Sequence, residues 1–227
     1  MADEPYVLAI ASHKGGTGRT TAACALAWLW GRDGLEVVLA DADPIGAAGL
    51  VAVDSNGRCD WPNVQFRDCA AGLEPDWSGA DLVIVDCSNL MDPAAQSVLQ
   101  HCHGVVLTCL ADPMALRTVP HAARALAEAR VANPKLELLG VVIGSYDGAD
   151  IVQAPMLDRL RTMHGEMLLE PPVPFDADLR DWALSPGAAL PQGAGAQALE
   201  AIRDRIADLV WRLHRIELGA DRLAGRA

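Results

Sequence analysis

The chain has 227 residues, 51% of them hydrophobic, and a formal net charge of −12 at pH 7. This length suits one α/β domain with a sizeable core, and the apolar content excludes an intrinsically disordered chain. The acidic balance excludes a surface covered with nucleic-acid-binding charge, although one local basic face remains compatible with it.

No apolar run reaches the ~20 residues of a membrane-spanning helix, and the N-terminus does not have the pattern of a signal peptide. The six cysteines are scattered, without a C-x-x-C pair that would indicate a zinc or iron–sulfur site. Several lie inside apolar runs, where reduced cysteine behaves as a small buried hydrophobic residue. We therefore expect a cytoplasmic protein with free thiols.

Short apolar runs of strand length alternate with helical patterns along the chain. The clearest strand is 81–86 (DLVIVD), a continuous β-branched run typical of a parallel sheet covered on both faces. The alternation predicts an α/β fold, a doubly wound, mostly parallel sheet with helices on both faces, in a single domain spanning 1–227. The predicted strands are 6–12, 36–40, 63–67, 81–86, 104–110, 137–145 and a short one within 167–174. The predicted helices are 20–31, 93–101, 114–131, 156–164 and an amphipathic C-terminal helix at about 194–218.

A glycine-rich loop, KGGTGRTT at 14–21, follows the first predicted strand. An ordinary phosphate-binding loop, G-x-x-x-x-G-K-[ST], would place its lysine at position 19. This chain has Arg19 there and Lys14 five residues earlier. Lysine is otherwise rare, with only Lys135 besides Lys14 against sixteen arginines. Retention of Lys14 indicates a need for a compact ammonium group at that position, because arginine and lysine are not interchangeable.

The loop and two acidic segments each follow directly on a predicted strand, so all three lie at the edge of the sheet where such folds bind ligands. Glycine amides and the following helix N-terminus suit phosphate, while Thr20 and Asp86 suit Mg²⁺. Alone, the loop is equally well an ordinary turn and Asp86 a cap, but their joint occurrence in this order favours a nucleotide site. The predicted nucleotide-binding residues of the loop are Lys14, Gly15, Gly16, Thr17, Gly18, Arg19, Thr20 and Thr21.

On these residues the chain resembles the ParA/MinD family of dimeric ATPases. KGGTGRTT resembles the family's deviant Walker A motif, and Asp41-Ala42-Asp43-Pro44 resembles the D-x-D-P after its second strand. The segment ADLVIVDCSN at 80–89 is similar to the family's third motif, and a weaker likeness at 173–187 suggests the loop that frames adenine. The likeness covers most of the chain and implies ATP and Mg²⁺ as cofactors and a homodimer across bound ATP.

The resemblance also implies roles for individual residues. Lys14 matches the signature lysine that reaches the partner's phosphates, and Asp43 matches the aspartate that orients the attacking water. The implied catalytic residues are Lys14, Asp43 and Arg19; the implied metal ligands are Thr20, Asp41 and Asp86; Pro174 and Phe175 would border the base.

Two departures from the family pattern bear on turnover. Arg19 replaces the second lysine of the motif, and Ser88-Asn89 replaces a pair of prolines. Arginine keeps the charge but is longer and planar, so we expect ATP binding with slow hydrolysis, stimulated by an unknown activating protein. The alternatives are harmless drift toward arginine, or a nucleotide-gated scaffold that scarcely hydrolyses ATP.

The C-terminal helix carries an arginine stripe next to an apolar face. At about 100° per residue, the arginines fall within a quarter of the circumference. The first interpretation of this stripe is an ordinary solvated helix face. The second is a contact surface for nonspecific DNA, and the third is a MinD-like surface that binds a membrane. The implied function is positioning or segregating a cargo, either plasmid or chromosomal DNA or a protein assembly, in the cytoplasm and in association with the nucleoid. The stripe consists of Arg205, Arg212, Arg215, Arg222 and Arg226.

Overall fold

The computed structural model describes residues 4–73, 77–216 and 218. Its centre is a six-stranded sheet in which every pairing is parallel, in the order β3-β2-β4-β1-β5-β6. This confirms the predicted α/β class. The strands are β1 (Tyr6–Ser12), β2 (Val37–Asp41), β3 (Val64–Asp68), β4 (Leu82–Asn89), β5 (Gly104–Leu110) and β6 (Glu137–Gly144).

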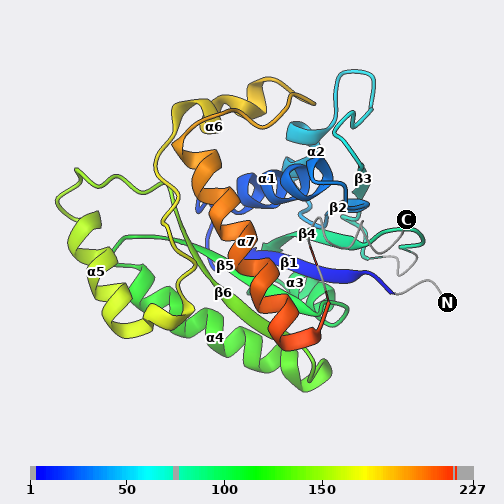
Figure 1. Cartoon of the computed structure of the whole chain (residues 1–227). Helices are drawn as coiled ribbons and strands as arrows, with labels where there is room; N and C mark the ends of the chain where they lie inside the picture. Colours follow the sequence, from blue (N-terminus) through cyan, green and yellow to red (C-terminus); the bar gives the residue numbers. More distant parts are fainter. Residues whose placement is uncertain (1–3, 74–76, 217, 219–227) are drawn as a thin grey trace.

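Helices cover both faces of the sheet, as Figure 1 shows. One core lies between the sheet and α1, α2 and α7, and the other lies between the sheet and α3, α4 and α5. In β1, Leu8 and Ile10 point into the first core, whereas Val7 and Ala9 point into the second, because successive side chains of a strand alternate between faces. The helices are α1 (Arg19–Arg32), α2 (Ala47–Ala52), α3 (Pro93–Leu99), α4 (Ala115–Ala132), α5 (Gln153–His164), α6 (Ala177–Asp181) and α7 (Ala194–His214), with 3₁₀ turns η1 (Gly165–Met167) and η2 (Trp182–Leu184).

Helix α1, which follows the glycine-rich loop, is buried on almost every side. Nine of its residues are buried, including Leu26, Leu29 and Trp30, because α7 and α2 pack over the surface that faces away from the sheet. A helix that is apolar all round is expected in such a position. The loop is therefore attached to an element held from all directions.

Two short helices and the end of β4 differ from the sequence prediction. The six residues of α2 and the five of α6 were not predicted. Both form where an aspartate accepts backbone N–H groups: Asp41 from Gly49 and Asp176 from Leu179. Strand β4 continues to Asn89 rather than ending at Asp86, because Ser88-Asn89 keeps the N–H groups that prolines would lack.

The C-terminal predictions are corrected in two places. The segment 167–174 is not a strand; it makes only isolated bridges from Leu168 and Pro174, since its prolines cannot donate to a ladder. Helix α7 ends at His214, where Arg215 adopts a left-handed conformation with φ 59°. The predicted continuation to residue 218 is therefore wrong.

All six cysteines are free, which confirms the expectation of unpaired thiols. Among the described residues, no helix is both long enough and apolar enough to cross a membrane.

Candidate functional site

The glycine-rich loop joins the end of β1 to the start of α1. Gly16 and Gly18 have φ values of 75° and 82°, a region where L side chains are disfavoured, so the glycines permit this turn. Among the described residues, no side chain caps α1. The first-turn amides of α1 have no intrahelical partner and remain available to an anion, which is the usual way a helix N-terminus binds phosphate.

The middle of the loop is held against the ends of β5 and β6. The Thr17 hydroxyl shares a buried hydrogen bond of 2.7 Å with the hydroxyl of Thr108 in β5. A Cβ on Gly144, the last residue of β6, would lie 2.4 Å from the Thr17 carbonyl oxygen. Only glycine allows the loop to approach this closely, so β5 and β6 fix where the loop backbone lies.

Arg19, the residue that departs from the usual motif, joins the loop to both acidic segments. Its Nε donates to Asp86 Oδ1 at 3.0 Å, and its Nη2 forms an ion pair with Asp43 Oδ2. The Thr20 hydroxyl donates to the other oxygen of Asp86, Oδ2, at 2.7 Å. The side chains of Arg19 and Asp43 are only 13% and 7% exposed, and that of Asp86 is fully buried. The predicted residues of the three segments therefore do come together.

Burial raises the pKa of Asp86 to about 6, from an ordinary value of 3.8. The positive charge of Arg19 and the hydrogen bond from Thr20 oppose this shift, and the negative charge of nearby Asp41 adds to it. The Asp86 carboxylate is thus costly to keep ionised and depends on a cation beside it.

Asp41 lies beside this cluster but uses its carboxylate on the backbone. Its oxygens accept the N–H of Asp43 at 3.2 Å and the N–H of Gly49, in α2, at 3.0 Å. These bonds fix the turn that carries Asp43 and anchor α2. Whether Asp41 also belongs to a metal shell stays a prediction.

Lys14 has a partner that sequence reasoning missed. Its Nζ lies 2.6 Å from Asp112 Oδ2, in the loop after β5, with side-chain exposures of 35% and 27%. The other oxygen of Asp112 accepts the N–H of Ala115 at the start of α4. The available signal was position, since Asp112 also follows a strand at the same edge of the sheet.

A cavity of about 330 Å³ opens beside the loop. It lies between Gly18, the end of β6 and the segment that carries Pro174 and Phe175, the two residues predicted to border the base. Phe175 is 55% exposed, and the Arg180 guanidinium stacks 5.7 Å from its ring centroid. An apolar slot next to a glycine-rich loop and a helix N-terminus suits a planar base joined to phosphates.

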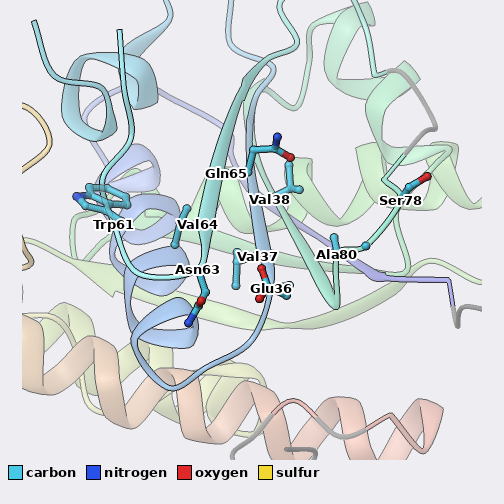
Figure 2. A pocket seen from close by; sticks show the side chains of 10 residues that line it. Glu36, Val37, Val38, Trp61, Asn63, Val64, Gln65, Ser78 and Ala80 are labelled. Carbon is cyan, nitrogen blue, oxygen red and sulfur yellow. The ribbon is translucent and has the colours of Figure 1, made fainter. Parts of the chain in front are cut away.

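A second hollow, of about 380 Å³, lies at the opposite end of the sheet. Figure 2 shows it at the amino ends of β2 and β3, with Trp61 and Asn63 on one side and Ser78 on the other. Ligands of parallel α/β sheets bind at the carboxyl ends of the strands, so we assign no nucleotide to this hollow despite its volume.

The arginine stripe of the C-terminal helix is only partly present. Arg205 and Arg212 are exposed on α7, with Asp208 between them, whereas Arg215 has left the helix and lies over the Trp211 ring. The predicted stripe members Arg222 and Arg226 lie outside the described residues.

Comparisons with known proteins show the family to which the fold belongs. The family model "CobQ/CobB/MinD/ParA nucleotide binding domain" matches residues 8–185. The chromosome-partitioning ATPase Soj of Thermus thermophilus is 28% identical over 235 residues, which cover 88% of this chain and 94% of the relative.

Solved structures with the same fold include a plasmid partition protein of Borrelia burgdorferi bound to AMPPNP, with a TM-score of 0.72 and 16% identity over 90% of this chain and 99% of that one. Another is cobyrinic acid a,c-diamide synthase of Mycobacterium smegmatis with ADP and magnesium, with a TM-score of 0.71 and 20% identity over 94% of this chain and 97% of that one. At these identities the likeness concerns the fold. Because the family match runs from β1 past α6 and includes the glycine-rich loop and both acidic segments, the chain belongs to the CobQ/CobB/MinD/ParA nucleotide-binding domain family.

Proposed function

We propose that the protein is a ParA-like ATPase that dimerises with ATP and Mg²⁺ to position or segregate a cargo. The observation that carries the proposal is the convergence of the phosphate loop, Asp43 and Asp86 at one edge of the sheet, beside a cavity of about 330 Å³. The partition ATPase relative supports the choice of a partition-type function.

The residues at this edge fit ATP with a magnesium ion. Mg²⁺ prefers oxygen ligands and usually takes only one or two protein carboxylates beside substrate phosphates. The Thr20 hydroxyl and the Asp86 carboxylate, 2.7 Å apart, supply such oxygens. No group of three His, Cys, Asp or Glu side chains in the described part of the chain forms a metal site by itself. The ion would therefore bind together with the nucleotide, where it neutralises phosphate charge.

In this scheme the chain supplies positioning and charge. The first-turn amides of α1 and the Arg19 guanidinium hold the phosphates, Asp43 orients the attacking water, and Phe175 and Pro174 border the base. Phosphoryl transfer needs little more than such placement and charge neutralisation. We expect slow turnover that an activating protein stimulates, because Arg19 places a bulkier cation where a lysine is usual.

Lys14 would complete the site of a second subunit. It lies at the rim, more exposed than Arg19, where a partner's phosphates could draw it from Asp112. A phosphate shared between two subunits joins them, and hydrolysis weakens the joint, so nucleotide state sets assembly state.

Binding to nonspecific DNA is the mode of cargo positioning that we propose, with the protein in the cytoplasm at the nucleoid. Exposed Arg205 and Arg212 on α7, with Arg215 beside them, are its candidate phosphate contacts. Two arginines flanking Asp208 form a weak patch on one subunit, and dimerisation would double it. A MinD-like surface on a membrane is the less favoured alternative.

A nucleotide-gated scaffold is the second candidate function. The observation that favours it is the pairing of Arg19 with both Asp43 and Asp86, which keeps both carboxylates occupied. Such a protein would bind ATP and dimerise but scarcely hydrolyse it.

The test combines sizing and turnover on the full chain. Light scattering after size exclusion, with and without ATP and Mg²⁺, is expected to show a nucleotide-dependent dimer, and phosphate release should be slow but measurable. Failure to bind ATP would refute the proposal. If the native protein and Arg19→Lys hydrolyse ATP at equal rates, the idea of a scaffold that Arg19 keeps from hydrolysing ATP fails. Faster ATP hydrolysis by Arg19→Lys than by the native protein would support the scaffold hypothesis for the native chain.

DNA binding should require ATP and should weaken steeply as the salt concentration rises. An absence of DNA binding at low salt with ATP would exclude DNA as the surface that the protein binds.

A further inference from the structure

The Arg19 guanidinium donates from all three of its nitrogens, two of them to carboxylates of the proposed metal and water site. Besides the contacts of Nε with Asp86 and of Nη2 with Asp43, its Nη1 donates to the Ser12 hydroxyl at 3.3 Å. The side chain is only 13% exposed. The guanidinium therefore forms a planar bridge between the end of β1, the turn after β2, and β4.

Both oxygens of Asp86 are occupied in this arrangement. Oδ1 accepts from Arg19 at 3.0 Å, and Oδ2 accepts from the Thr20 hydroxyl at 2.7 Å. In the proposed function the same carboxylate and hydroxyl serve a magnesium ion. A metal cation and the Arg19 guanidinium cannot both lie against Asp86 Oδ1, because their positive charges repel strongly in a poorly solvated place.

We propose that Arg19 is the resident cation of this site in the nucleotide-free protein, and that it excludes a divalent cation until phosphate draws the guanidinium away from Asp86 and Asp43. The inference rests on the proposed function for the identity of the displacing anion. A divalent cation then enters only together with the nucleotide, and Arg19 exchanges carboxylate partners for phosphate partners.

The arginine, rather than the usual lysine, makes this exclusion strong. A guanidinium is a rigid fork whose donors contact several acceptors at once, whereas an ammonium is a compact point charge on a flexible stem. Lysine at position 19 would keep a charge near Asp86 but would not span Asp43, Asp86 and Ser12 together. The strength of exclusion should therefore fall in the order arginine, lysine, uncharged residue.

Direct metal binding without nucleotide tests the proposal. Mn²⁺ also prefers oxygen ligands, and its free concentration is measured by electron paramagnetic resonance. On the full chain without nucleotide, we expect Arg19→Met to bind one Mn²⁺ at least ten-fold more tightly than the native protein, with Arg19→Lys in between. The double variant Arg19→Met with Asp86→Asn is the matched control and should lose the gain. Equal Mn²⁺ affinity of the native protein and Arg19→Met would overturn the proposal.

A measurement on the native protein alone covers the case in which Arg19→Met does not fold. Mn²⁺ binding is expected to be weak without nucleotide and to rise at least ten-fold with AMPPNP; tight binding to Asp86 without nucleotide, abolished by Asp86→Asn, would overturn the proposal. Titration of a fluorescent ATP analogue in the presence of Mg²⁺ distinguishes failure of the proposed function from failure of the role given to Arg19. If the analogue does not bind, the proposed function fails. If the analogue binds but the Mn²⁺ affinity of the native protein is the same with and without nucleotide, only the proposed role of Arg19 fails.

Discussion

The two ends of the central sheet handle buried polar groups in opposite ways. At the carboxyl end, Arg19, Asp43 and Asp86 are charged and paired with one another. At the amino end, Tyr6 stacks on His103 with ring centroids 5.3 Å apart and meets the edge of His214 at 5.1 Å. The Tyr6 hydroxyl and His214 Nε2 are buried without a hydrogen-bond partner among the described residues.

The difference indicates that the carboxyl end of the sheet is a ligand site, whereas the amino end is a packed part of the core. Paired charges at the carboxyl end can exchange one partner for another, which suits a ligand that brings its own charges. The ring contacts at the amino end join neutral groups: burial raises the pKa of Tyr6 well above its ordinary value, so the phenol stays protonated. We therefore expect changes at the carboxyl end to alter activity and changes at the amino end to alter stability.

The largest expected effect is that of Asp86→Ala. It removes the buried carboxylate that binds Arg19 and Thr20, so ATP hydrolysis should fall about 100-fold or more. Phosphate release under saturating ATP and Mg²⁺ measures it, with circular dichroism to verify the fold. Native-like turnover in a folded variant would show that the charged cluster is not a catalytic site.

Lys14 and Asp112 give a matched pair of variants. Lys14→Met should abolish the ATP-dependent dimer, because the ammonium group is lost. Asp112→Asn should release the lysine and tighten the dimer; a pair this exposed contributes at most about 1 kcal/mol, so the gain should be at most ~5-fold. Sedimentation velocity with AMPPNP measures both. Weaker dimerisation of Asp112→Asn would instead indicate that Asp112 itself contacts the partner.

At the amino end, Tyr6→Phe should stabilise the protein. The variant removes a buried hydroxyl that has no partner among the described residues, and such a group costs about 1 kcal/mol or more. The free energy of unfolding in urea should therefore rise by about 1 kcal/mol, while ATP hydrolysis stays unchanged. Tyr146→Phe is the matched control, at the half-buried second tyrosine, with an expected change within about 0.5 kcal/mol. A loss of stability in Tyr6→Phe would reveal a partner for the hydroxyl.

The smallest expected effect is a pH dependence carried by His103. Burial, helped by His214 and Lys135 and opposed by Glu4, lowers the pKa of His103 from its ordinary 6.5. Its Nδ1 must be unprotonated, because it accepts the Val7 N–H at 2.9 Å. The unfolded chain therefore takes up the proton first, and stability should fall as pH drops below about 6.5.

Urea unfolding of the native protein and of His103→Gln across pH 5 to 8 checks this contribution. The difference in unfolding free energy between the two proteins should shrink on the acidic side. A difference independent of pH would show that His103 titrates alike in the folded and unfolded chains.

Local sequence patterns were sufficient to predict the sheet, most helices and the tight turn of the glycine-rich loop. Strands such as 81–86 are apolar runs buried on both faces, and the glycines of the loop mark a backbone that other residues disfavour. The joint position of Asp43 and Asp86 followed from the rule that the carboxyl ends of parallel strands share one edge.

The pairings within the site could not be predicted in the same way. Lys14 and Asp112 are 98 positions apart, and Arg19 contacts Asp86 across 67 positions, so only the folded chain brings them together. Helix α2 was missed because it has only six residues, so its buried Ala48, Val51 and Ala52 make one apolar turn too short to stand out in the sequence. The end of α7 was missed because apolar spacing continues past Arg215, where the backbone turns.

The burial of α1 on almost every side limits how nucleotide could be sensed. A helix packed between the sheet, α2 and α7 cannot shift without opening both the sheet contact and the α7 contact. It therefore acts as a fixed support, and the parts left to respond are the loops that carry Asp43 and Asp112. A conformational change on phosphate binding would therefore pass through the turn before α2 and the start of α4 rather than along the axis of α1.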